Sequence, residues 1–160
     1  MPTPTYTYLD SVTLGSNASS VTLSNIDQNY GYLVLVIEAV FSYDGRAPYI
    51  RFNGDTGSNY NQVLVKANNT SPQSESNSNI STFQVAGYQN VVTTTIFDYA
   101  KTDKHKSILS RSASASSSFP EVQAFAGRWA STAAITSITV SLNADNLETG
   151  TTVYLYGIEA

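Results

Sequence analysis

The stretch with the clearest potential for site chemistry runs from Arg51 to Val65 and reads RFNGDTGSNYNQVLV. Within it, Asn53, Asp55 and Asn59 offer amide and carboxylate oxygens only a few residues apart. Calcium prefers such oxygen ligands, but it needs about six to eight of them, and the EF-hand spacing ends in a bidentate Glu. No Glu follows here at that distance. The three residues are therefore an incomplete calcium site.

The other interpretation is a turn between two strands. Glycine adopts a positive φ without steric cost, and an Asp side chain can accept a hydrogen bond from the backbone two residues further on. We predict that Gly54 and Gly57 supply positive φ and that Asp55 closes an Asx-turn. The turn would connect strands at Tyr49–Asn53 and Gln62–Lys66. We favour the turn and keep calcium as the alternative.

Side chains in this region also suit contact with a sugar or a protein surface. The candidate contact residues are Asn53, Asp55, Asn59, Tyr60, Asn68 and Asn69. The last two belong to the polar stretch KANNTSPQSESNSN, residues 66–79, which we predict to be a surface loop. Tyrosine supplies 11 of the aromatic residues. Its apolar ring and polar tip serve cores, sheet edges and binding surfaces alike.

Residues suited to enzyme catalysis are few. His105 is the single histidine and lies between Lys104 and Lys106, a poor setting for a general base. The chain has no cysteine and no G-x-S-x-G motif, so it lacks the usual nucleophiles. The remaining acid pairs, which we interpret as surface acids, are Asp98 with Asp103 and Asp145 with Glu148. We predict a protein that is not an enzyme and needs no cofactor.

Composition limits the partners. The 160 residues include 12 acidic and 8 basic side chains, for a net charge of -4, which argues against nucleic-acid binding. Charged residues make up 12%, against about 25% in ordinary domains. The longest apolar run, Tyr32 to Phe41, is interrupted by Glu38 and is shorter than the about 20 residues that span a bilayer. We expect no signal peptide and no membrane contact, and the absence of cysteine fits synthesis in a reducing cytoplasm.

In the segments that must position these residues, apolar side chains recur at every second position. Leu33, Leu35 and Ile37 alternate with further apolar residues, which predicts a central strand that is buried on both faces. Residues 138–142 alternate apolar and polar, as expected for a strand with one exposed face. Further strands are predicted at 6–14, 20–26, 49–53, 62–66, 80–86, 91–99, 106–112, 122–131 and 153–156.

This pattern of short strands predicts an all-β fold with very little helix, an antiparallel β-sandwich that is jelly-roll-like. Turn signals support it, including Tyr43-Asp44-Gly45-Arg46. We find no domain boundary and predict one domain over residues 1–160, with residues 1–8 as an extended N-terminal arm. Trp129 is predicted to anchor the core.

The chain resembles a group of small β-rich virion proteins of tailed bacteriophages, of the marine and cyanophage type. The resemblance covers nearly the whole chain and is carried by YTYLDSVTLGSNASSVTLSNI, YGYLVLVIEA, RFNGDTGSNYNQVL, IFDYAKTDKHKSI, FAGRWASTAAITSITV and GTTVYLYGI. The group often has GLW where this chain has Gly127-Arg128-Trp129, and this chain adds Glu159-Ala160. The resemblance supplies no catalytic pattern.

The resemblance implies a component of the virion. One expectation is a capsid decoration or cement protein that forms a homotrimer and clamps neighbouring major capsid subunits. The alternative is a tail or tail-fibre module that recognises a host-surface glycan through the loops named above. The expected partners are thus the major capsid protein or other virion proteins, and in the alternative a glycan.

Overall fold

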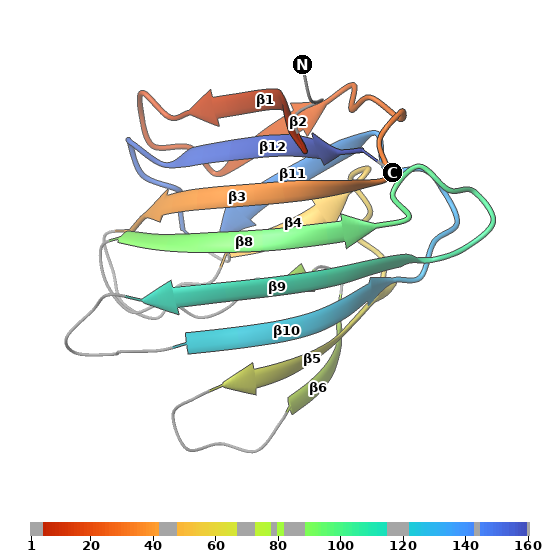
Figure 1. Ribbon diagram of the computed structural model, residues 1–160. Helices are drawn as coiled ribbons and strands as arrows, with labels where there is room; N and C mark the ends of the chain where they lie inside the picture. Colours follow the sequence, from red (N-terminus) through yellow and green to blue (C-terminus); the bar gives the residue numbers. More distant parts are fainter. Residues whose placement is uncertain are drawn as a thin grey trace.

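The computed structural model describes residues 5–41, 48–66, 73–77, 80–81, 89–114, 122–142 and 145–159. These residues form two antiparallel β-sheets that pack together, and they contain no α-helix. Figure 1 shows the larger sheet in front and the smaller one behind its upper part. The prediction of an all-β, antiparallel sandwich is confirmed.

The larger sheet has eight strands in the order β1-β12-β3-β8-β9-β10-β5-β6. In that order the strands are β1 (Tyr6–Thr13), β12 (Thr152–Ile158), β3 (Tyr32–Val40), β8 (Gln89–Phe97), β9 (Lys106–Ser114), β10 (Val122–Trp129), β5 (Tyr60–Lys66) and β6 (Gln73–Asn77). The last four strands extend this sheet downward in Figure 1.

The smaller sheet has the order β2-β11-β4-β7. Its strands are β2 (Ser20–Ser24), β11 (Ser137–Leu142), β4 (Pro48–Phe52) and β7 (Ile80–Ser81). Successive strands β1 to β4 alternate between the two sheets, and β11 and β12 do the same. This alternation is consistent with the interleaved Greek keys of a jelly roll, which stays a prediction.

The core lies between the sheets because inward-facing positions alternate with outward-facing ones along each strand. Leu33, Leu35 and Ile37 of β3 have exposed fractions of 0%, and they join Ile138 and Val140 of β11 in one hydrophobic cluster. The period-two pattern therefore identified the core residues of both sheets correctly.

The second face of β3 differs from the prediction. The strand is central, between β12 and β8, as predicted. On its outward face Val34 is buried, Val36 is half-buried and Glu38 is exposed. Among the described residues no other strand layer lies over this face. Val34 has only 6% of its surface exposed, so the prediction of burial on both faces holds at Val34, in part at Val36, and not at Glu38.

Two other predictions need correction. Gln73–Asn77, predicted as part of a loop, forms β6 and pairs antiparallel with β5. An edge strand needs only backbone pairing on one side, so its polar sequence gave no strand signal. Residues 6–8, expected in the N-terminal arm, belong to β1 and pair with β12. The hairpin predicted at Tyr43–Arg46 lies outside the described residues.

Candidate functional site

The segment Asn53–Asn59 forms a tight turn at one end of the sandwich. Asn53 and Gly54 have φ values of 53° and 67°, and the Asp55 amide donates to the Phe52 carbonyl at 2.9 Å. Two successive positive φ values of this kind are typical of a type I′ turn. Gly57 lacks a positive φ, so that prediction was wrong.

Close packing explains the glycine at position 57. A Cβ there would lie 2.8 Å from Asn59 Nδ2 and 3.2 Å from Asp55 Oδ1. Such distances are far below an ordinary contact, so a side chain would push Asn59 and Asp55 apart. The position therefore needs a glycine for the space around it, which the sequence alone does not distinguish from a need for positive φ.

The Asp55 carboxylate accepts three hydrogen bonds from the protein. Oδ1 accepts from the Gly57 amide at 2.8 Å, which confirms the predicted Asx-turn. Oδ2 accepts from Trp129 Nε1 at 2.7 Å and from Asn59 Nδ2 at 2.9 Å. The hydrogen bond from Trp129 holds the pKa of Asp55 below its ordinary value, against an opposing effect of burial.

Three aromatic rings pack beside this carboxylate. The rings of Tyr60 and Trp129 stack at 6.4 Å between centroids, and Phe52 lies 5.5 Å from Trp129. The Tyr60 hydroxyl accepts from the Phe52 amide at 3.1 Å and donates to the Asp55 carbonyl at 3.3 Å. Burial raises the pKa of Tyr60 to about 12. We call Phe52, Asp55, Tyr60 and Trp129 the aromatic corner.

The three calcium candidates are not arranged around a common point. Asn53 Oδ1 accepts from the Thr136 and Ser137 amides at 2.8 and 3.1 Å. Asn59 turns its amide nitrogen, not its oxygen, toward Asp55. Among the described residues no group of three or more His, Cys, Asp or Glu side chains could hold a metal. The side chains of Asn53, Asp55 and Asn59 thus hold loops together, while Asn68 and Asn69 lie outside the described residues.

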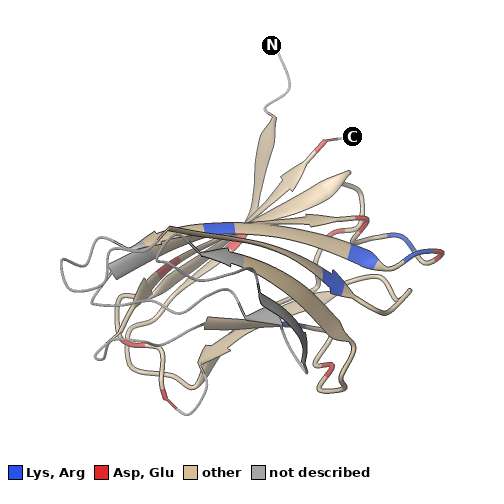
Figure 2. Ribbon diagram, turned by 90° about the horizontal axis from the view of Figure 1, so that it is seen from below, with Lys and Arg blue, Asp and Glu red and all other residues tan. Residues whose placement is uncertain are grey.

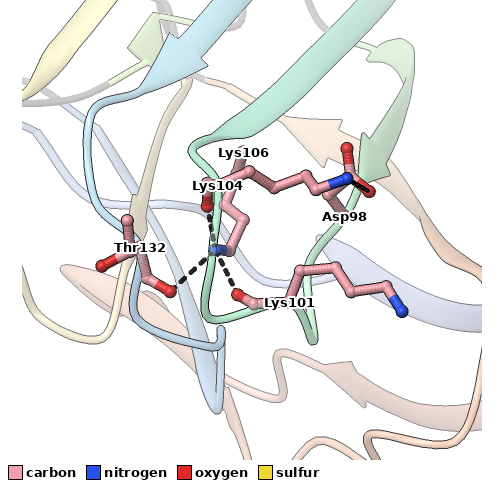
Figure 3. Close-up of polar contacts among 5 residues, drawn as sticks. All are labelled: Asp98, Lys101, Lys104, Lys106 and Thr132. Atoms are coloured by element: carbon pink, nitrogen blue, oxygen red, sulfur yellow. Dashed lines mark hydrogen bonds and ion pairs between the residues drawn. The ribbon is translucent and has the colours of Figure 1, made fainter.

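Lys106 is a structural residue that the sequence did not reveal. Its side chain is fully buried, and its ammonium donates to the carbonyls of Lys101, Lys104 and Thr132 at 2.6, 2.9 and 3.2 Å (Figure 3). Burial lowers the pKa of Lys106, and the carboxylates of Asp98 and Asp103 oppose this. All three N–H donors are used, so Lys106 ties the loop before β9 to the loop after β10.

The remaining catalytic candidates do not form a site around Lys106. His105 is exposed, next to the buried ammonium in sequence only. Asp98 makes an ion pair with Lys104 at 3.8 Å (Figure 3), and Asp103 is exposed. The alternation of side chains along a strand could have identified Lys106 as an inward-facing residue, because it lies two positions from Ile108 on the same face of β9.

A second feature is the outward face of the larger sheet. The exposed large apolar residues of the described chain all lie on its strands: Tyr6, Tyr8, Val63, Val91, Leu109 and Val122, with exposed fractions of 46–63%. Figure 2 shows this sheet as the upper layer, with few charged residues along it. Large apolar side chains exposed together on one sheet face indicate a candidate contact site.

Tyrosines dominate one end of that face. The ring of Tyr156 on β12 lies 6.3 Å from Tyr6 and 6.2 Å from Tyr8 in edge-to-face geometry, and 6.5 Å from Tyr154. The Tyr8 hydroxyl lies 2.9 Å from Ser11 Oγ. We call Tyr6, Tyr8, Tyr154 and Tyr156 the tyrosine cluster. Sequence reasoning counted the tyrosines but did not predict that these four would meet.

Comparison with known proteins adds no family. No protein-family model matches the chain, and no curated protein matches it. Among the described residues no helix is long and apolar enough to cross a membrane. The aromatic corner is built for stability, so the outward face of the larger sheet is the best candidate for a functional surface.

Proposed function

We propose that the chain is a non-enzymatic structural protein of a phage virion, a capsid decoration or cement protein that clamps neighbouring major capsid subunits. The observation that carries the proposal is the apolar outward face of the larger sheet, where Val91, Leu109 and Val122 are at least half exposed. The sequence resemblance to phage virion proteins supports the same assignment.

The physical basis of such a role is the area of contact. A rigid β-sandwich presents its surface without first having to order a loop, so little conformational entropy is lost on binding. An interface of about 800 Å² per partner is enough for stable attachment. Many copies, each with a modest interface, would together resist the internal pressure of packaged DNA.

The test is the number and position of copies in purified particles. Quantitative mass spectrometry is expected to give hundreds of copies per virion, and imaging of the particle is expected to place them on the outer shell. A few to dozens of copies at the tail would contradict the decoration role. Absence from purified virions would contradict any structural role in the particle.

The tyrosine cluster favours a second candidate, a tail or tail-fibre module that recognises a host-surface glycan. Tyr6 and Tyr8 are 59% and 58% exposed, and exposed aromatic rings can stack on sugars while nearby hydroxyls donate hydrogen bonds. A reproducible hit on a glycan array that Tyr8→Ala abolishes would favour this role. A Thr22→Ala variant on the smaller sheet is the control.

A further inference from the structure

On the outward face of the larger sheet, β12 and β10 differ in side-chain bulk at two positions. β8 is the fourth strand of the eight. On one side of it, β12 turns Tyr154 and Tyr156 outward, and both rings are half-buried. On the other side, β10 turns Ala124 and Ala126 outward, and both are exposed. β12 and β10 each lie two strands from β8.

The strand register places these residues of β12 and β10 in the same rows across the sheet. One row across the sheet runs Tyr8, Tyr156, Val34, Thr95, Leu109, Ala126 and Val63. The next row runs Tyr154, Val36, Thr93, Arg111 and Ala124. In both rows the large rings and the alanines are therefore equally far from β8, on opposite sides.

We propose that two copies of this chain pair through this face, related by a two-fold axis that runs along β8. An isologous contact of this kind uses the same patch twice. The axis superposes β12 on β10 and β3 on β9, so Tyr156 of each copy lies over Ala126 of the other, and Tyr154 lies over Ala124. Bulky side chains thus meet small ones, which is what close packing of two sheet faces requires.

Glu38 and Arg111 on this face are complementary under the same axis, while Arg128, exposed on the same face of β10, donates a hydrogen bond to Asn61 of its own chain. Glu38 of β3 and Arg111 of β9 are exposed, and neither has an ionic partner among the described residues. The axis places Glu38 over Ala113, which lies in the same row on β9. Arg111 is two residues away, about 7 Å along the strand, within reach of both long side chains. Each Glu38 therefore pairs with the Arg111 of the other copy.

The size of the face fits a pair. The axis along β8 superposes the seven strands from β1 to β5. Six spacings of about 4.8 Å give a width of about 29 Å, and strands of six residues give a length of about 20 Å. The product, about 600 Å², is of the same order as the about 800 Å² per partner of a standard interface. Self-complementary charge and bulk favour a second copy over a glycan as the partner on this face.

This inference rests on the proposed function and assigns the outward face to a second copy, so a decoration protein paired in this way would contact the capsid through its other surfaces. A two-fold contact builds dimers, so it competes with the homotrimer expected from the sequence. The full chain has a mass of 17.2 kDa. Analytical ultracentrifugation over a range of concentrations is expected to show a species of twice that mass.

Charge reversal is the decisive experiment. Glu38→Arg and Arg111→Glu are each expected to weaken the dimer at least tenfold, and the double variant is expected to restore it. Asp103→Arg, an equal charge change in an exposed loop, is the control and is expected to leave the dimer unchanged. Ala126→Trp is expected to abolish pairing, while Ser24→Trp on the smaller sheet is not.

The outcomes separate this inference from the proposed function. A monomer at every concentration, a trimer, or a dimer indifferent to all these variants would overturn the two-fold contact. Circular dichroism of each variant checks that the fold is kept. A monomer found in hundreds of copies on the shell would leave the decoration role intact. A charge-dependent dimer that is absent from virions would leave the contact intact and overturn that role.

Discussion

Tyrosine has opposite surroundings in the aromatic corner and in the tyrosine cluster. Tyr60 is 0% exposed, stacks on Trp129, and has both a donor and an acceptor for its hydroxyl. Tyr8 is 58% exposed and contacts Tyr156 edge to face. Tyr60 and Tyr8 lie on opposite faces of the same sheet. The residue type alone therefore does not predict whether a tyrosine is buried in the core or exposed on the surface. Its odd or even position along the strand does, because this position decides on which face of the sheet the side chain lies.

This contrast indicates where the molecule is stabilised and where it is available for contact. In the corner every polar atom named above has a protein partner, so those residues are committed to folding. In the cluster the rings contact one another, and Tyr6 and Tyr8 stay more than half exposed. Substitutions in the corner should therefore change the stability of the monomer, and substitutions in the cluster should change association.

The largest expected effect comes from removing the indole of the corner. Trp129→Ala should lower the free energy of unfolding by about 4 kcal/mol, because it leaves a cavity and removes a donor to Asp55. Tyr156→Ala on the outward face should cost no more than about 1 kcal/mol, the value of a cross-strand pair. Urea denaturation of the monomer measures both, and equal losses would contradict the division of roles.

The next prediction tests whether the stability of the fold depends on the buried ammonium of Lys106. Lys106 lies in the same row as Trp129 and Tyr60. Lys106→Met should cost about 3 kcal/mol, because the carbonyls of Lys101, Lys104 and Thr132 would lose their donor. Lys104→Met, which breaks a partly exposed ion pair, should cost less than about 1 kcal/mol. Thermal unfolding compares them, and similar melting temperatures would show that Lys106 is dispensable.

The sequence predicted the framework better than it predicted these two sites. Alternation at Leu33 and Ile138 identified the strands because one buried face imposes a period of two. It did not identify Lys106. Lysine is so rarely buried that an inward position on a strand does not by itself predict its burial. The tyrosine cluster depends on the register between β1 and β12, which arises from pairing between residues far apart in the chain.

The next largest effect is a loss of stability at alkaline pH, through Tyr60 of the aromatic corner. The pKa of Tyr60 is about 12 in the folded protein, against an ordinary value of 10.0. The unfolded chain loses this proton near pH 10 and the folded chain does not, so stability is present below pH 10 and is lost as pH rises toward 12. The loss is roughly 2–3 kcal/mol at 1.36 kcal/mol per pKa unit. Denaturant midpoints between pH 9 and 12 should fall less in Tyr60→Phe.

A tyrosine outside both groups sharpens the comparison. The ring of Tyr30 lies against Gly157 of β12, where an added Cβ would clash with its Cγ. Gly157→Ala should therefore cost about 1–3 kcal/mol through overpacking. Tyr30→Ala should relieve that clash, so the double variant should lose less than the sum of the single losses. Strict additivity in urea denaturation would rule out this contact.

The smallest effect concerns the acid at the centre of the corner. The hydrogen bond from Trp129 is the first cause of the lowered pKa of Asp55. Because the folded pKa lies below the unfolded one, the carboxylate stabilises the fold above its ordinary pKa of 3.8 and loses this contribution as pH falls through the folded value. Stability measured between pH 5 and 2 should therefore decline less steeply in Asp55→Asn. A Trp129→Phe variant should flatten the same profile in part, since it removes the donor but keeps an aromatic ring. An unchanged slope in both variants would mean that other carboxylates govern the acid response, and that the corner is held together by its rings alone.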